Sequence, residues 1–176
     1  MLALGLERQG VRSVTARSSS PMGEMSGDKP GATTSLVVDA SVGLKWVVDE
    51  VGSDEAFALL LGHPLIVPGL FWVEAANALA SKVRRGDLDR ADASDAWLDL
   101  EEAPVETVPI TKELVRASLE VAHDLRHPIY DCLYLTLAIS REATLVTADS
   151  RLLTRVASRP ALARRVRSLF PVDTGS

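Results

Sequence analysis

Short apolar runs alternate with longer amphipathic stretches along most of the chain, from Ser35 onward. The short runs predict strands, over residues 36–38, 65–67, 144–147 and 105–110, the last interrupted by a proline. The longer stretches repeat their apolar positions at helical spacing and predict helices, over residues 53–62, 70–84, 89–102, 111–125, 128–141 and 150–158. Residues 168–172 predict an additional edge strand. This alternation is typical of an α/β fold with a mostly parallel sheet.

Two hydroxyl residues stand where helices are expected to begin. Ser53 comes just before Asp54, and Thr111 comes before Lys112. Serine and threonine commonly accept a hydrogen bond from a free amide of the first helical turn. We therefore expect both to be N-caps.

The first 34 residues follow neither the helical nor the strand period and include the segment Ser18–Pro21. We expect a flexible extension over residues 1–34 and an ordered domain over residues 35–173. A start codon assigned too early, ahead of Met22 or Met25, would explain the extension without giving it a function. It contains no apolar segment of signal-peptide length.

Composition narrows the classes of protein that the chain can belong to. The net charge of −5 disfavours a generic basic nucleic-acid binder. The single cysteine, Cys132, excludes an intramolecular disulfide framework and is compatible with a reducing compartment. No apolar run approaches the roughly 20 residues of a membrane span. We expect a cytoplasmic protein without a membrane partner.

Four acidic residues occupy positions that meet at one edge of the predicted sheet. Asp39 directly follows the first strand, and Asp149 follows the strand that begins at Thr144. Glu74 and Asp131 lie near the starts of two of the predicted helices. In a parallel α/β fold, helix N-termini face the same edge as the carboxyl ends of the strands, where ligands bind.

Converging carboxylates repel one another and lose hydration, so they need a compensating charge. Mg²⁺ or Mn²⁺ is the expected cation because both prefer oxygen ligands. No cluster of His and Cys has the spacing of a zinc site. Taken singly, each acid would be better explained as a helix cap or a solvated charge than as a metal ligand.

Four short motifs carry a further indication, because they occur together in one order. They are VDAS at 38–41, VP followed by EAANAL within 67–79, YDCLYLTLA at 130–138, and LVTAD at 145–149. Together they resemble the PIN-domain ribonucleases, and within that family the VapC-type toxins of bacterial toxin–antitoxin pairs. The resemblance extends over roughly residues 36–172.

The resemblance implies a three-layer PIN-like fold with a central five-stranded sheet flanked by helices. It implies that Asp39, Glu74, Asp131 and Asp149 hold Mg²⁺ or Mn²⁺ and catalyse hydrolysis of RNA phosphodiester bonds. It further implies a VapB-like antitoxin as partner and a homodimer. Two alternatives stay open from the residues themselves, namely a housekeeping PIN nuclease in RNA processing and a non-catalytic PIN-fold binding module.

Several other residues are candidates for supporting the site. Ser41, two residues after Asp39, is expected to bond a carboxylate or to cap a helix. Asn77 shares a helical face with Glu74, and we expect it to orient that carboxylate. Thr147 is expected to share a strand face with Asp149 and to donate a hydrogen bond into the site.

RNA needs basic residues, because an acidic pocket does not hold phosphates without them. Arg151 and Arg155 lie four residues apart on the predicted helix that begins beside Asp149, and we expect them to contact RNA. A second basic group, within residues 82–85, is equally explained by its place at a helix C-terminus. His127, just before Pro128, has no regular metal-ligand spacing, and a surface or capping role is the expectation for it.

Overall fold

The computed structural model describes residues 10–12 and 34–170, and its centre is a five-stranded sheet in the order β3-β2-β1-β4-β5. The strands are β1 (Leu36–Val38), β2 (Leu65–Pro68), β3 (Val105–Val108), β4 (Thr144–Thr147) and β5 (Val166–Ser168). Every neighbouring pair is parallel. The predicted α/β class and five-stranded sheet are therefore confirmed, and the sheet is parallel throughout.

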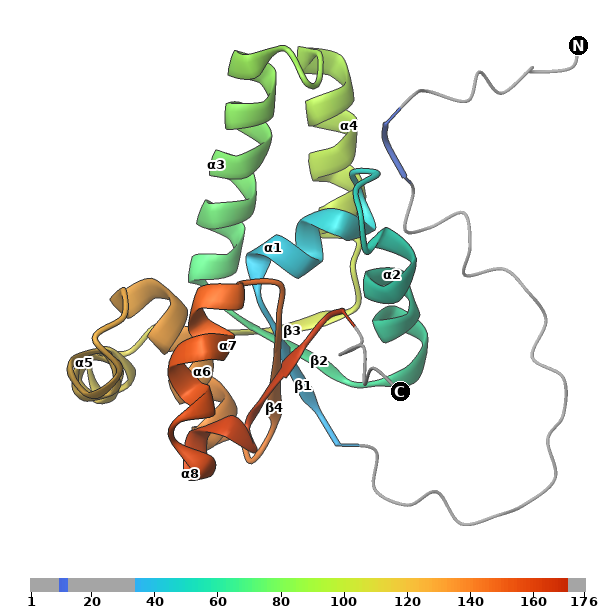
Figure 1. The fold of residues 1–176 in the computed structure, drawn as a ribbon. Coiled ribbons are helices and arrows are strands. Elements are labelled where there is room, and N and C mark those ends of the chain that lie inside the picture. The colour runs from blue at the N-terminus through green and yellow to red at the C-terminus, as the bar shows by residue number, and fades with distance from the viewer. Residues whose placement is uncertain (1–9, 13–33, 171–176) are drawn as a thin grey trace, which may run out of the picture.

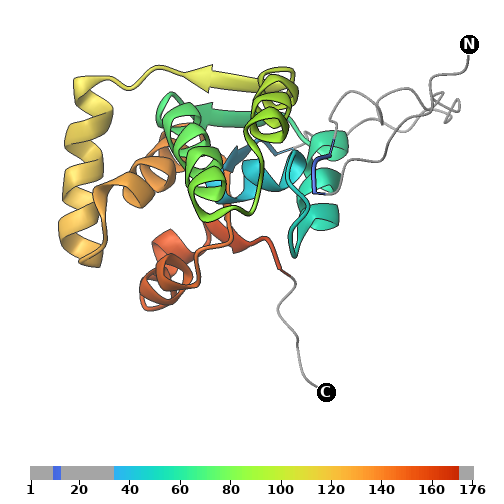
Figure 2. The same ribbon diagram turned by 90° about the horizontal axis from the view of Figure 1, so that it is seen from above.

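Helices flank the sheet on both faces and extend beyond it (Figure 1). In chain order they are α1 (Ala40–Gly43), the 3-10 turn η2 (Leu44–Trp46), α2 (Ser53–Gly62), α3 (Leu70–Arg85), α4 (Arg90–Glu101), α5 (Lys112–Leu125), α6 (Ile129–Ser140), α7 (Ser150–Ala157) and α8 (Pro160–Ala163). Helix α6 packs against β1, β2 and β4, and α5 packs on α6. The view from above shows α5 as the outermost helix on that side (Figure 2).

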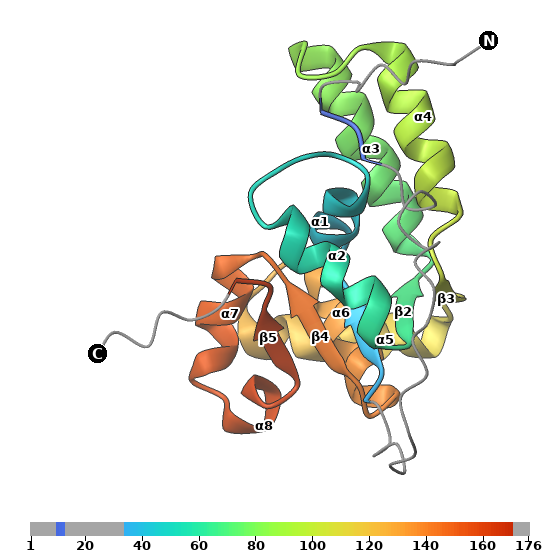
Figure 3. The ribbon, with the colours of Figure 1, turned by 90° about the vertical axis from the view of Figure 1, so that its right-hand side faces the viewer.

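The antiparallel pair α3 and α4 rises away from the sheet, while α7 and α8 lie beside β5 (Figure 3). The central strands β1 and β4 are almost wholly buried, which explains their continuous apolar runs. Leu36, Val37 and Val38 pair in register with Thr144, Leu145 and Val146. This register places the residues that follow β1 and β4 next to one another.

A close contact at Gly43 holds α1 against α3. A β-carbon at Gly43 would overlap the ring of Phe71, so a larger residue there would push the two helices apart. Phe71 is fully buried and also stacks edge-on against Trp72. The contact fixes the start of α3 beside the end of β1, which is where Asp39 stands.

Two details of the secondary structure differ from the sequence predictions. The N-cap of α2 is Gly52, with a φ of 88°, instead of Ser53. The Ser53 hydroxyl instead donates to the Val48 carbonyl and accepts from the Glu50 amide, so it is consumed by the turn ahead of the helix. The last strand is β5 (Val166–Ser168), earlier than the predicted 168–172. Its register with β4 decides this, because Leu145 pairs with Val166.

The predicted extension over residues 1–34 lies outside the described residues except at 10–12 and 34. There Val11 forms an antiparallel bridge with Val48. Arg12 lies 3.0 Å from Asp49 and 2.9 Å from Asp54 in two ion pairs. No helix in the described part of the chain is both long and apolar enough to cross a membrane.

Candidate metal centre

Asp39 and Asp149 stand at neighbouring strand ends, and the Thr147 hydroxyl joins the Asp39 carboxylate to the Asp149 backbone amide. The Thr147 hydroxyl donates to Asp39 Oδ2 at 2.6 Å and accepts from the Asp149 amide at 3.0 Å. Thr147 is completely buried at the end of β4, so its hydroxyl position is fixed by packing. The sheet therefore sets the distance between the two aspartates.

Both aspartates also cap helices, as the alternative interpretation of single acids anticipated. Asp39 Oδ1 accepts from the Ser41 amide at 3.0 Å at the start of α1, and Asp149 Oδ1 accepts from the Arg151 amide at 2.8 Å at the start of α7. Each cap uses Oδ1, which leaves Oδ2 directed elsewhere. Capping and a role in a metal site are therefore compatible in these two residues.

Asp131 and Glu74 come from the helices. Asp131 lies in the first turn of α6, where the partial positive charge of the helix N-terminus favours a carboxylate. Glu74 lies in α3 beyond the Gly43–Phe71 contact, and its Oε2 accepts a hydrogen bond of 2.5 Å from the Tyr134 hydroxyl. The structure thus brings α3 and α6 together across 60 residues of sequence at this edge of the sheet.

The pKa values of three of the four acids show that they interact. Burial raises the pKa of Asp39 above its usual range, and nearby Asp149 raises it further. Burial likewise raises the pKa of Glu74, with added repulsion from Asp39 and Asp131. For Asp131 the raising effect of burial and of the two other aspartates exceeds the opposing effect of His127. The four predicted acids therefore lie in one electrostatic cluster.

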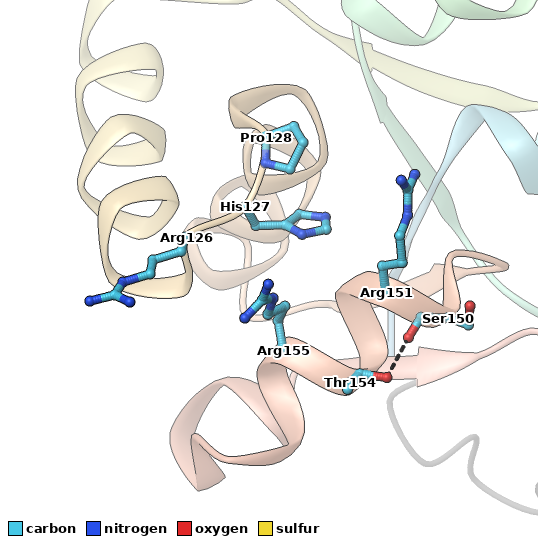
Figure 4. A pocket seen from close by; sticks show the side chains of 7 residues that line it. All are labelled: Arg126, His127, Pro128, Ser150, Arg151, Thr154 and Arg155. Atoms are coloured by element: carbon cyan, nitrogen blue, oxygen red, sulfur yellow. Dashed lines mark hydrogen bonds between the residues drawn. The ribbon is translucent and has the colours of Figure 1, made fainter.

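His127 belongs to this cluster, although its spacing in the sequence gave no sign of it. Its side chain is only 5% exposed, and Nε2 lies 2.9 Å from Asp131 Oδ2 and 3.7 Å from Asp149 Oδ2. The 2.9 Å contact joins His127 to Asp131, and its alignment at Nε2 falls short of a regular hydrogen bond. Figure 4 shows the ring reaching from the α5–α6 connection toward α7.

His127, Asp131 and Asp149 each present a ligand atom, and these atoms lie within 4.8 Å of one another. A cation among them would meet two carboxylate oxygens and one imidazole nitrogen. Tyr134 is the second residue that sequence reasoning missed. It stands three residues after Asp131 on α6, on the same helical side, and that spacing was the available signal.

Of the predicted supporting residues, Ser41 bonds its expected carboxylate and Asn77 does not. The hydroxyl and amide of Ser41 both act on Asp39, where they lower its pKa against the effect of burial. Asn77 is exposed on α3 and makes no hydrogen bond to Glu74 within the described structure. Tyr134 instead orients Glu74, because it is buried and lies on the facing helix.

The two basic groups differ in how their charges are used. Lys82 contacts Glu50, Arg84 donates to Ser81, and Arg85 pairs with Asp87. In contrast, Arg151 and Arg155 are exposed on α7 and line a pocket of about 420 Å³ that His127 also lines (Figure 4). The arginines of α7 are therefore the basic group beside the carboxylates.

Comparisons with known proteins agree with this architecture. The family whose model matches is the PIN domain, over residues 36–158. PAE2754 from Pyrobaculum aerophilum is similar in structure, with a TM-score of 0.59 and 22% identity over 80% of this chain and 93% of that chain. A toxin–antitoxin complex from Klebsiella pneumoniae has a TM-score of 0.54 and 13% identity over 78% of this chain and 99% of that chain.

VapC20 of Mycobacterium tuberculosis, a toxin that cleaves the sarcin-ricin loop, is also similar in structure. The TM-score is 0.52, with 16% identity over 70% of this chain and 95% of that chain. At such identities these likenesses concern the fold. No curated protein matches the chain.

Proposed function

The chain belongs to the PIN-domain family, and on that premise we propose that it is an endoribonuclease dependent on Mg²⁺ or Mn²⁺, acting as the toxin of a VapBC-type pair. The proposal is supported mainly by the cluster of four carboxylates, which His127 adjoins with its Nε2 at 2.9 Å from Asp131 Oδ2. Close, partly buried carboxylates destabilise the folded chain through their repulsion and lost hydration. A bound divalent cation would offset that negative charge.

The residues present fit a hard divalent cation. Asp39, Asp131 and Asp149 offer carboxylate oxygens, and Glu74 offers the oxygen that Tyr134 does not occupy. A neutral His127 with its proton on Nδ1 would add Nε2 as one nitrogen ligand, which suits Mn²⁺ better than Mg²⁺, because Mg²⁺ is held mainly by carboxylates and water. When bound, the cation would lower the pKa of water and offset the charge of a phosphate.

The chain's own residues prepare this chemistry by positioning. Thr147 and Ser41 hold the Asp39 carboxylate through both of its oxygens, which fixes its rotation. Tyr134 orients Glu74 through one of its two oxygens, Oε2. Their fixed orientation avoids reorganisation when a phosphodiester approaches, which is the main source of electrostatic catalysis. Arg151 and Arg155 are proposed to contact the RNA backbone.

The proposed partner is a VapB-like antitoxin, and the proposed assembly is a homodimer. The structural relatives include the Klebsiella complex and VapBC2 of Rickettsia felis bound to promoter DNA. An apolar groove of about 500 Å³ between α3 and α4, lined in part by Leu79, Trp97 and Leu98, offers a surface for such contacts. An RNA substrate and the single cysteine both suit a cytoplasmic protein.

The test is cleavage of single-stranded RNA by the purified chain, free of antitoxin, with Mg²⁺, Mn²⁺ or EDTA. We expect metal-dependent cleavage that falls at least about 100-fold in Asp39→Asn. The matched control is Glu142→Gln, an exposed acid ahead of β4 at the opposite edge of the sheet, which should retain full activity. A chain that binds RNA without cutting it under any metal condition would be a binding module instead.

A further inference from the structure

A pocket of about 420 Å³ adjoins the carboxylates, between the α5–α6 connection and α7 (Figure 4). His127 lines both the pocket and the carboxylate cluster, so the two are continuous. Three arginines line the pocket, at 126, 151 and 155, and no carboxylate is among its described lining residues. A cavity with this lining suits an anion, directly beside the proposed metal centre.

The charges in this pocket are available for a ligand. The guanidinium groups of Arg126 and Arg155 form no ion pair with a described residue, and both residues are exposed. Arg151 lies 3.6 Å from Asp149, but 84% of its side chain is exposed. A second pocket of about 480 Å³ shares Arg126 and Arg155 and adds Arg159. Asp124 also lines this second pocket, so of the two it is the first whose described lining is free of carboxylates.

The backbone at Arg126 is in a conformation that arginine adopts at a cost. Arg126 ends α5 with a φ of 49° and a ψ of 51°, the left-handed region where glycine is the usual residue. The turn is required, because the next amide, that of His127, donates to the Ala122 carbonyl at 3.1 Å. Since the Arg126 side chain is exposed, packing does not explain an arginine at this position.

We propose that this pocket binds a backbone phosphate of the substrate RNA beside the scissile one, with Arg126 as a phosphate-contacting residue. The inference rests on the proposed RNA cleavage and names the binding site that would serve it. Guanidinium groups match phosphate oxygens with two parallel hydrogen bonds. Because phosphates carry no sequence information, the pocket supplies affinity and register without base preference.

The experiment compares Arg126→Gly with Glu142→Gly. Glu142 is the other described non-glycine residue with a positive φ, at 52°, and it lies at the far end of the sheet. Glycine should relieve backbone strain in both, so each variant should melt about 2–4 °C higher than the unaltered chain. Binding is measured by fluorescence anisotropy in EDTA with a labelled 20-nucleotide single-stranded RNA of mixed sequence.

We expect Arg126→Gly to bind this RNA about tenfold more weakly, with the slope of log affinity against log salt reduced by about 0.7. Glu142→Gly should bind as the unaltered chain does. Arg126→Lys keeps the charge and should retain part of the affinity without the gain in melting temperature. Stability and RNA binding would then change in opposite directions at one position.

Unchanged RNA affinity in Arg126→Gly would overturn the proposal, as would a failure of the unaltered chain to bind the RNA. If inorganic phosphate alone raises the melting temperature as much as RNA does, the pocket is a small-anion site, and the proposal is also wrong. Cleavage is measured separately. A chain that loses RNA binding in Arg126→Gly but never cuts RNA supports the pocket and contradicts the nuclease proposal.

Discussion

Two clusters of partly buried charge lie in this molecule, and they are balanced in different ways. At the carboxylate edge, four acids face one histidine, and the exposed Arg151 lies 3.6 Å from Asp149. In the loop between η2 and α2, Glu50 stands between two lysines. Its Oε2 lies 3.0 Å from Lys45 Nζ, and its Oε1 contacts Lys82 Nζ. Burial raises the pKa of Glu50, but the two lysines outweigh it and lower that pKa below its ordinary value.

The opposite pKa shifts separate a structural cluster from a functional one. The Lys45–Glu50–Lys82 cluster is satisfied within the chain and serves to join η2, the following loop and α3. At the carboxylate edge negative charge remains in excess, and Asp39, Glu74 and Asp131 have raised pKa values. Unbalanced buried charge is destabilising, so its presence points to a ligand that supplies the missing positive charge.

The largest expected contrast comes from neutralising one acid in each cluster. Asp131→Asn should reduce RNA cleavage at least about 100-fold, yet raise the melting temperature without metal, by about 2–4 °C per kcal/mol of repulsion relieved. Glu50→Gln should retain cleavage but lose roughly 1–3 kcal/mol of stability, because two lysines lose their partner. Thermal unfolding in EDTA and RNA cleavage with Mn²⁺ measure both effects. A fall in melting temperature for both variants would contradict the distinction.

A smaller effect is expected from removing the hydroxyl that joins the two strand-end aspartates. Thr147→Val loses the hydrogen bonds to Asp39 and from Asp149, so Mn²⁺ affinity should fall about 10- to 100-fold. Thr136→Val is the matched control, because its buried hydroxyl bonds only the Cys132 carbonyl of its own helix. Isothermal titration calorimetry distinguishes them. Equal losses in the two variants would show that Thr147 acts through general stability.

The smallest effect is the pH dependence of stability, which has opposite signs in the two clusters. Asp39 has a raised pKa when folded, so metal-free stability rises as pH falls from that pKa toward the ordinary 3.8. Glu50 has a lowered pKa, so its contribution is present above its ordinary 4.5 and is lost as pH falls through the folded value.

Denaturant unfolding without metal should show both trends. The stability advantage of Asp39→Asn over the unaltered chain should be full at pH 7 and shrink toward pH 4. The disadvantage of Glu50→Gln should stay constant from pH 7 to pH 5 and shrink only below that. Parallel curves for the two variants would indicate that the clusters do not differ in charge balance.

The sequence predicted most of the sheet and predicted that the four acids meet at one edge. Both predictions succeeded because buried strands and strand-end aspartates are local patterns. It did not predict the place of His127, since a left-handed residue at Arg126 and the following Pro128 decide where that ring points. The bond between Tyr134 and Glu74 joins two helices and follows from packing at Gly43 and Phe71. The predicted N-cap at Ser53 was wrong because the Ser53 hydroxyl bonds Val48 and Glu50 in the turn before the helix.

Binding of a divalent cation at the carboxylate edge can be measured by titrating Mn²⁺ and following its electron paramagnetic resonance signal. We predict that the unaltered chain suppresses the signal of free Mn²⁺ and that Asp39→Asn suppresses it much less, without any RNA present. We also predict nitrogen coupling to bound Mn²⁺ that disappears in His127→Gln and persists in His123→Gln, an exposed histidine on α5. A free Mn²⁺ signal that the unaltered chain leaves unchanged at millimolar protein would show that this edge binds no divalent cation.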